Sequence, residues 1–312
     1  MKNIVLAIST ALLTLPLLQS CEDLEVVEVP NFEIAYESTV KVGEPVTFTV
    51  TNAPDFLNFY AGDNGHQYKF RERTNAEGTV TMSFRNSQKW GLGSNASDTF
   101  SVWYSRDYDG SGEAASVTAA TWTDISDRFS ISDRYDFTFQ SSGFVDISDL
   151  ADGIPIFIGF RYFSENTADR GAEWYFDDFN IDMLEEEKTE PLKVATEKNP
   201  GFTPVDVQGI EDSWNAAKWY FDTGKEADGI WRMRGNSHRI VNEDWLITAP
   251  LNLTKVAPDS GVALKTYSEK LHSFSHTYDT PGTYTLTFVA NNQTIYGQEV
   301  LVKEYTITVT DN

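Results

Sequence analysis

Hydrophobic and polar residues alternate with a period of two through most of the chain. In residues 283–288, for example, threonines occupy one side while Tyr284, Leu286 and Phe288 occupy the other, as a half-buried strand requires. No stretch shows a sustained 3.6-residue apolar stripe with helix caps. The pattern therefore predicts an all-β protein.

The clearest predicted strands lie at the two ends of the chain. They cover residues 32–37, 45–52, 56–60, 284–290 and 299–309. Neither end has enough strands to enclose a core, but together they supply about the seven strands of an immunoglobulin-like sandwich.

The same pattern predicts how the chain is divided. We expect one split β-sandwich made from residues 31–80 and 271–312, interrupted by an inserted β-sandwich over residues 81–270. The predicted order therefore places a whole domain between two halves of another.

The chain begins with a lysine and a short apolar run over residues 4–18. Such a run is too short to span a bilayer and is typical of a secretory leader. It ends in Leu-Gln-Ser-Cys, and this Cys21 is the only cysteine in the chain. The ending resembles the lipobox of bacterial lipoproteins, in which the cysteine thiol takes a diacylglycerol. We expect residues 1–20 to be a signal peptide and Cys21 to be lipidated; the alternative is an ordinary secretory leader that contains a cysteine.

Residues 21–30 form an acidic segment directly behind this cysteine, with four acidic side chains. One interpretation is a solvated tether. The segment also resembles the signal that sends Bacteroidetes lipoproteins to the outer face of the outer membrane. We therefore expect a protein that faces the cell exterior and is attached to the membrane by its lipid anchor only.

The composition limits the partners of the protein. Asp and Glu number 47 against 24 Lys and Arg, which gives a net charge of −23. A field of this sign repels phosphate backbones, so nucleic acid is not an expected partner. With its single thiol acylated, the chain has no disulfide and depends on burial for stability.

Three segments of the predicted split sandwich resemble the PKD-type immunoglobulin module. They are residues 41–48 (Lys-Val-Gly-Glu-Pro-Val-Thr-Phe), 59–65 (Phe-Tyr-Ala-Gly-Asp-Asn-Gly) and 276–284, which contains His-Thr-Tyr and Pro-Gly-Thr-Tyr. The resemblance implies a structural role, because PKD-like modules commonly act as spacers or adhesion units.

Five segments of the predicted insertion resemble the jelly-roll domains called choice-of-anchor J. They cover residues 102–110, 120–125, 156–162, 174–181 and 242–248. The Glu-Asp-Trp-Leu-Ile segment follows the Asp-Tyr-x-Gly segment here, whereas it usually precedes it, which suggests a permuted strand order. The whole arrangement resembles an uncharacterised family of Bacteroides surface lipoproteins, a domain of unknown function that often accompanies glycan-uptake systems.

Catalytic and metal-binding patterns are weak. The chain has none of the common serine-hydrolase, zinc-protease or phosphate-loop motifs. Asp177 and Asp178 are adjacent acids on a predicted strand, so we expect them to point to opposite faces. The Asp-rich residues 107–113 suggest a turn, with a structural Ca²⁺ held by Asp107 and Asp109 as the alternative. No enzyme activity and no other cofactor are expected.

Aromatic residues make up 13% of the chain and include eight tryptophans. Those inside the resembling segments are expected in the core: Trp103, Trp122, Trp174 and Trp245. Others lie in loop-like surroundings beside basic residues, where an exposed ring can stack on a sugar and polar neighbours can bind its hydroxyls. These candidate glycan-binding residues are Trp90, Trp214, Trp219, Tyr220, Trp231 and Arg232. The alternative is that their rings cover the ends of the sandwich.

The sequence thus favours a non-catalytic surface lipoprotein that binds or presents an extracellular polysaccharide or oligosaccharide, with an outer-membrane transporter complex as a partner. An adhesion or assembly module with a protein ligand is the first alternative. A glycoside-acting enzyme is the second.

Overall fold

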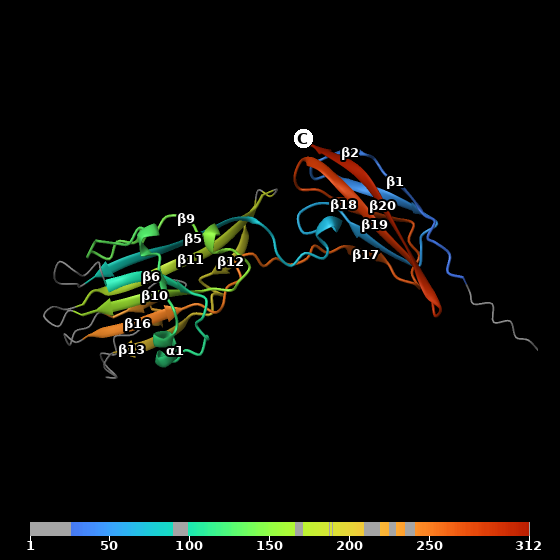
Figure 1. Cartoon of the computed structure of the whole chain (residues 1–312). Helices are drawn as coiled ribbons and strands as arrows, with labels where there is room; N and C mark the ends of the chain where they lie inside the picture. The colour runs from blue at the N-terminus through green and yellow to red at the C-terminus, as the bar shows by residue number, and fades with distance from the viewer. Residues whose placement is uncertain are drawn as a thin grey trace, which may run out of the picture. The chain divides into compact units, whose positions relative to one another are not determined.

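The structure is a computed structural model that describes residues 26–89, 99–165, 171–186, 188, 190–208, 219–224, 229–234 and 241–311. The chain forms two compact units (Figure 1). The first unit contains residues 1–72 and 258–312, and the second contains residues 73–257. Strands form nearly all of the regular structure, so the all-β prediction is confirmed. Among the described residues, none of the helices has the length and apolar character needed to cross a membrane.

Two sheets form the first unit. The three-stranded sheet has the order β1 (Glu33–Ala35), β3 (Pro45–Thr51), β18 (Ser273–Thr277). The five-stranded sheet has the order β17 (Val262–Lys265), β4 (Phe56–Tyr60), β19 (Gly282–Thr294), β20 (Gly297–Thr310), β2 (Thr39–Lys41). A short 3₁₀ turn, η1, covers Tyr68–Phe70.

Strand pairs that join the two ends of the chain hold the first unit together. β18 pairs with β3, and β19 pairs with β4, so residues more than two hundred positions apart become neighbours. Four phenylalanines meet between the sheets: the rings of Phe48 and Phe274 lie 4.8 Å apart, and those of Phe59 and Phe288 lie 4.9 Å apart. The two ends of the chain therefore share one core.

The five-stranded sheet of the second unit has a helix over one of its faces. Its order is β13 (Thr203–Gln208), β16 (Asn242–Ile247), β10 (Phe157–Ser164), β6 (Phe100–Ser105), β7 (Thr123–Asp124). The helix is α1 (Ala114–Ala119), and Val117 from this helix packs among the residues of that face.

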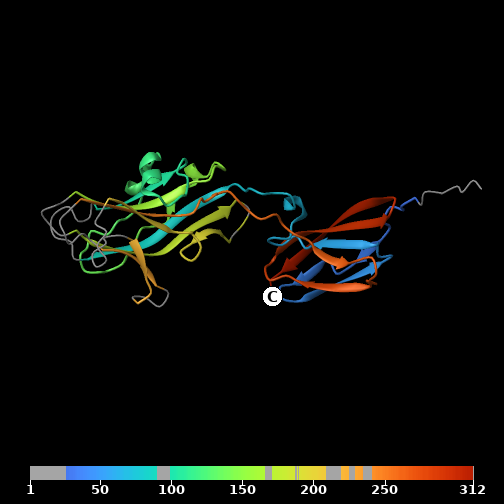
Figure 2. The same cartoon turned by 90° about the horizontal axis from the view of Figure 1, so that it is seen from below.

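The other sheet of the second unit has seven strands. Its main order is β14 (Trp219–Asp222), β15 (Ile230–Met233), β11 (Glu173–Glu185), β5 (Gly78–Lys89), β8 (Gln140–Ser141). In addition, β12 (Leu192–Thr196) pairs with β11, and β9 (Val145–Asp146) pairs with β5. Two short 3₁₀ turns, η3 (Ser126–Arg128) and η4 (Ser148–Leu150), complete the described elements. The two sheets face each other as layers, which Figure 2 shows from a second direction.

The boundaries between the units differ from those that the sequence pattern predicted. The amide of Ala76 donates to the carbonyl of Thr254, and the amide of Val256 donates to the carbonyl of Thr74, which places residues 73–76 in the second unit. β17 pairs with β4, which places it in the first unit. The second unit therefore begins about eight residues before the predicted position and ends about thirteen before it.

Stacked aromatic rings fill the space between the two sheets of the second unit. Phe160 and Phe176 lie 4.3 Å apart, and Phe100 lies 4.9 Å from Trp174. The Trp174 indole is fully buried and donates to Thr99 Oγ1 at 2.8 Å, so burial leaves no polar atom of this ring without a partner.

Three of the four tryptophans predicted to be core lie on the other face of the five-stranded sheet. Trp245 is buried there, while Trp103 and Trp122 are only partly buried. The rings of Trp122 and Trp245 lie 4.5 Å apart above Gly159. Of these four, Trp174 is the one that lies between the sheets. A period of two shows that residues alternate between faces, but it does not show which face of the sheet is covered.

A single methyl group at Gly159 tests this packing. An added Cβ would lie 2.8 Å from Trp245 and 2.9 Å from Trp122. Non-bonded carbon atoms in a packed core do not come this close to each other. We expect Gly159→Ala to lower the free energy of unfolding by about 1–3 kcal/mol in urea titrations. Gly224→Ala, whose Cβ would meet nothing closer than 3.4 Å, is the control and stays near wild type. Equal stability of both variants would contradict the packing.

Candidate functional site

A pocket of about 370 Å³ lies in the second unit. Its wall consists of residues from the loop between β12 and β13 and from strands β14 and β15: Glu197, Lys198, Pro200, Gly201, Phe202, Phe221 and Trp231. Most of this wall is aromatic or apolar, with one acidic and one basic side chain. Such a combination is typical of small-molecule sites.

Two aromatic side chains on neighbouring strands form one side of the pocket. Phe221 and Trp231 are directly opposite each other in the β14–β15 pair, with ring centres 5.3 Å apart in an edge-to-face arrangement. Phe221 is 42% exposed, and Trp231 is partly buried. Gly229 has a φ of +85°, and an added Cβ would lie 2.4 Å from the Phe221 ring. The glycine therefore lets the ring lie against the backbone.

The loop after β12 forms the other side of the pocket. Phe202 contacts Trp231 with a ring distance of 5.5 Å and contacts Phe179 of the core at 5.3 Å. The amide of Ala249 donates to the carbonyl of Pro200 at 2.7 Å. Gly201 has a φ of +61°, and a Cβ there would lie 2.7 Å from the Ala249 side chain. These contacts fix the loop to the sandwich, so the wall is preformed.

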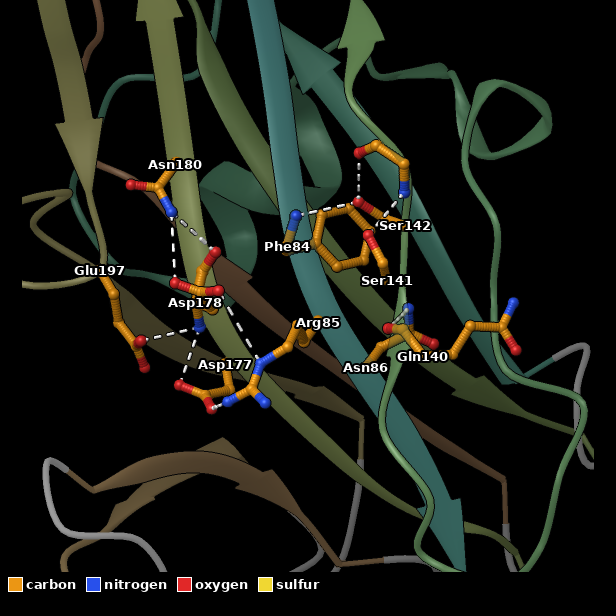
Figure 3. A network of polar contacts seen from close by, with 11 residues as sticks. Phe84, Arg85, Asn86, Gln140, Ser141, Ser142, Asp177, Asp178, Asn180 and Glu197 are labelled. Atoms are coloured by element: carbon orange, nitrogen blue, oxygen red, sulfur yellow. Dashed lines mark hydrogen bonds and ion pairs between the residues drawn. The ribbon is translucent and has the colours of Figure 1, made fainter.

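A bulge in β11 lies beside the pocket. The pairing of β11 with β5 shifts between Asp177 and Asn180, and Asp178 adopts a left-handed φ of 54°. Arg85 hydrogen-bonds the Asp177 carboxylate, and its Nε lies 3.8 Å from Asp178 Oδ2 (Figure 3). Both carboxylates therefore face the same guanidinium. The prediction that they point to opposite faces is wrong, because the bulge breaks the alternation of a regular strand.

The bulge also holds Glu197 of the pocket wall. The backbone amide of Asp178 donates both to Asp177 Oδ1 and to Glu197 Oε2, at 2.8 Å each. Glu197 Oε1 is buried and has no donor among the described residues. Burial, together with the neighbouring Asp177 carboxyl, raises the pKa of Glu197 to about 8. Glu197 is therefore mostly uncharged at neutral pH, whereas Arg85 neutralises Asp177.

A comparison with known protein families identifies the family to which the chain belongs. Residues 20–202 match the family described as a domain of unknown function, DUF5017, which is more than half of the sequence. The chain belongs to the DUF5017 family. No curated protein and no solved structure matches it. The DUF5017 match includes Glu197 and Phe202 of the pocket and ends before Phe221 and Trp231.

Of the glycan-binding residues predicted for this DUF5017 protein, Trp231 lies at the pocket and Trp219 does not. Trp219 is 1% exposed and contacts Phe100 between the sheets, so its ring face is closed to a sugar. This corrects the prediction: Trp219 and Phe221 lie on the same face of β14, but Trp219 is covered by the core, whereas Phe221, two residues further on, reaches the pocket. Trp90, Trp214 and the lipidation candidate Cys21 lie outside the described residues.

Tyr220 and Arg232 point to the other face of the β14–β15 pair. They are cross-strand neighbours, one position from Phe221 and Trp231 respectively, so alternation turns them away from the pocket. Arg232 hydrogen-bonds Glu173 and pairs with Asp222 at 3.0 Å. Its guanidinium is therefore engaged in ion pairs within the protein, and it forms no part of the pocket wall.

The two candidate calcium ligands have structural roles in the loop before α1. Asp107 Oδ1 accepts from the Thr121 amide at 2.8 Å, and Asp109 accepts from the Ser111 amide at 2.9 Å and the Ser116 hydroxyl at 2.8 Å. Within the part of the chain that the structure describes, no three His, Cys, Asp or Glu residues are placed to hold a metal ion. The hydrogen bonds support the turn interpretation.

Trp231 is the one residue of this pocket wall that sequence reasoning predicted; among those it missed are Glu197, Lys198, Phe202 and Phe221. Phe221 follows Trp219 and Tyr220 in one aromatic run. By period-two alternation it shares a strand face with Trp219, so it was an equally good candidate for a binding residue. Glu197 gives no local signal. Its position becomes apparent only when β12 pairs with β11 and brings it to the bulge.

The raised pKa of Glu197 predicts how stability changes with pH. The folded protein holds the Glu197 proton up to a pH of about 8, whereas an unfolded glutamate loses it near its ordinary pKa of 4.5. The contribution to the free energy of unfolding is therefore complete below the ordinary pKa and is lost as the pH rises through the folded one. We expect the stability of wild type to fall between about pH 5 and about pH 9 in urea titrations.

Glu197→Gln removes the titration and keeps the shape, so its stability declines less over this range. Glu190→Gln, at an exposed glutamate of the same unit, is the control and follows wild type. If Glu197→Gln and wild type changed in parallel with pH, the pKa of Glu197 would not be raised in the folded protein.

Proposed function

We propose that the protein is a non-catalytic, lipid-anchored surface protein that binds an extracellular polysaccharide or oligosaccharide in the pocket at Trp231. The observation that carries this proposal is the edge-to-face pair of Phe221 and Trp231 at the pocket. Aromatic faces of this kind stack on the apolar C–H side of a sugar ring.

The polar side chains of the wall complement such a ligand. Exposed Lys198 offers an ammonium donor to sugar hydroxyls at the rim, and the Glu197 carboxyl, which is mostly uncharged at neutral pH, places little negative charge beside an uncharged ligand. The pocket volume falls in the lower part of the range of roughly 300–1,000 Å³ that small-molecule sites occupy. A short segment of a glycan is therefore a suitable occupant.

The cellular setting is part of the same proposal. The lipobox-like ending at Cys21 and the acidic residues 21–30 support a lipoprotein of Bacteroidetes type on the outer face of the outer membrane. An outer-membrane glycan transporter is the corresponding partner. The first unit then serves as a PKD-like spacer, and the second, which is choice-of-anchor J-like, carries the ligand.

The carboxyls beside the pocket support binding rather than glycoside cleavage. Cleavage needs two carboxyl groups separated by about 5 to 9.5 Å across the sugar. Glu197 and Asp177 both accept from the backbone amide of Asp178 at 2.8 Å, which leaves no space between these carboxyls for a substrate.

Removing the Trp231 ring tests the proposed site. We expect Trp231→Ala to weaken binding to the glycans that wild type retains on an array or in an affinity gel by about tenfold, equivalent to about 1.4 kcal/mol. Phe144→Ala, at an aromatic residue that is also in the second unit but outside the pocket wall, is the control and retains full binding. Circular dichroism verifies that both variants are folded. Undiminished glycan binding by Trp231→Ala, or retention of proteins and no glycan by wild type, contradicts the proposal.

A further inference from the structure

The β19–β20 hairpin of the first unit ends in an exposed apolar tip. Ile295 is 90% exposed and Tyr296 is 53% exposed, and both lie in the turn between the strands. Burial of such side chains is favourable, so an apolar or interfacial surface is the environment that suits them.

The start of the described chain lies along this tip. The Asn292 amide donates to the carbonyl of Glu28 at 2.9 Å, and a Cβ on Gly297 would lie 3.8 Å from Val27. Figures 1 and 2 both show the N-terminal segment leaving the first unit beside the end of the hairpin. Val26, in the same segment, is 85% exposed. The tip and the N-terminal segment therefore occupy the same end of the unit.

The length of the chain before this contact limits where the tip lies. Cys21 is seven residues before Glu28. Even a fully extended chain covers at most about 3.6 Å per residue, so the two residues are separated by no more than roughly 25 Å. If Cys21 carries the lipid of the proposed function, on which this step rests, the tip lies close to the surface of the bilayer.

The charge of the tip differs from that of the chain. Residues 289–298 contain no charged side chain, although the protein as a whole has a net charge of −23. A neutral tip is not repelled by anionic lipid headgroups, whereas the acidic remainder is. Tyrosine is also one of the residues enriched at membrane–water interfaces.

The strand order separates this tip from the connections to the second unit. β4 runs from Phe56, paired with Asn291 near the tip, to Tyr60, paired with Thr287. The chain therefore leaves this sheet at the end away from Ile295. The points where the chain leaves the first unit therefore lie at the other end of this sheet from the tip.

We propose that Ile295 and Tyr296 at the β19–β20 tip insert into the interface of the membrane that holds the lipid anchor. The single acyl-bearing cysteine then fixes the position of the first unit, and the tip fixes its orientation. The hairpin of about 13 residues per strand extends roughly 40 Å away from the bilayer, at about 3.3 Å per residue.

A probe at the tip tests this proposal in the full-length acylated protein. Acylation consumes the thiol of Cys21, so Ile295→Cys introduces the one thiol available for an environment-sensitive fluorophore. The protein is reconstituted in vesicles of phosphatidylethanolamine and phosphatidylglycerol, with and without brominated acyl chains. We expect bromine to lower the fluorescence at position 295 by about twofold or more, because the probe lies at the depth of the headgroup and acyl boundary.

Asp279→Cys, at an exposed position next to the opposite end of β19, is the matched control and keeps its fluorescence. Equal quenching at both positions, or none at position 295, overturns the proposal. Mass spectrometry of the same samples separates the two failures. An acylated Cys21 without quenching overturns only the membrane contact, whereas a chain without acyl groups overturns the lipid anchor and the membrane contact together.

Discussion

The bulge between Asp177 and Asn180 is the constraint on which the pocket depends. It turns β11 so that Phe179 enters the core while the neighbouring amide of Asp178 holds Glu197. Phe179 in turn supports Phe202, which contacts Trp231. One irregularity in a long strand thus links the aromatic core, the paired carboxyls and the wall of the pocket. Bulges commonly redirect side chains in this way at functional sites.

The strands were the most predictable part of the molecule. The predicted residues 56–60 coincide with β4, and the two long predicted strands near the C-terminus lie within β19 and β20. Period-two alternation identifies such strands because one face packs on a core and the other meets water. It does not identify which face of a sheet receives a second layer. Alternation therefore does not distinguish Trp219, which is buried between the sheets, from Trp103 and Trp122, which are only partly buried on the other face of the five-stranded sheet.

The site was only partly predictable for a different reason. Trp231 was recognisable as an aromatic residue among polar neighbours, but Glu197 acquires its properties from Asp177, a residue twenty positions away. That contact requires the β11–β12 pairing and the left-handed backbone of Asp178. Asp adopts this backbone conformation only occasionally, and no local sequence pattern predicts it at Asp178. Long-range pairing and a local irregularity together produced the site.

The resonances of the tryptophan indoles during a titration with oligosaccharides test the central claim most directly. Each indole N–H gives a separate NMR signal, so the signals that shift on addition of the ligand identify the tryptophans beside which it binds. The account predicts that the Trp231 signal shifts in a saturable way, whereas the signals of Trp174 and Trp219 in the core stay in place. A ligand that shifts the signals of Trp103 and Trp122 and leaves that of Trp231 unchanged would contradict it.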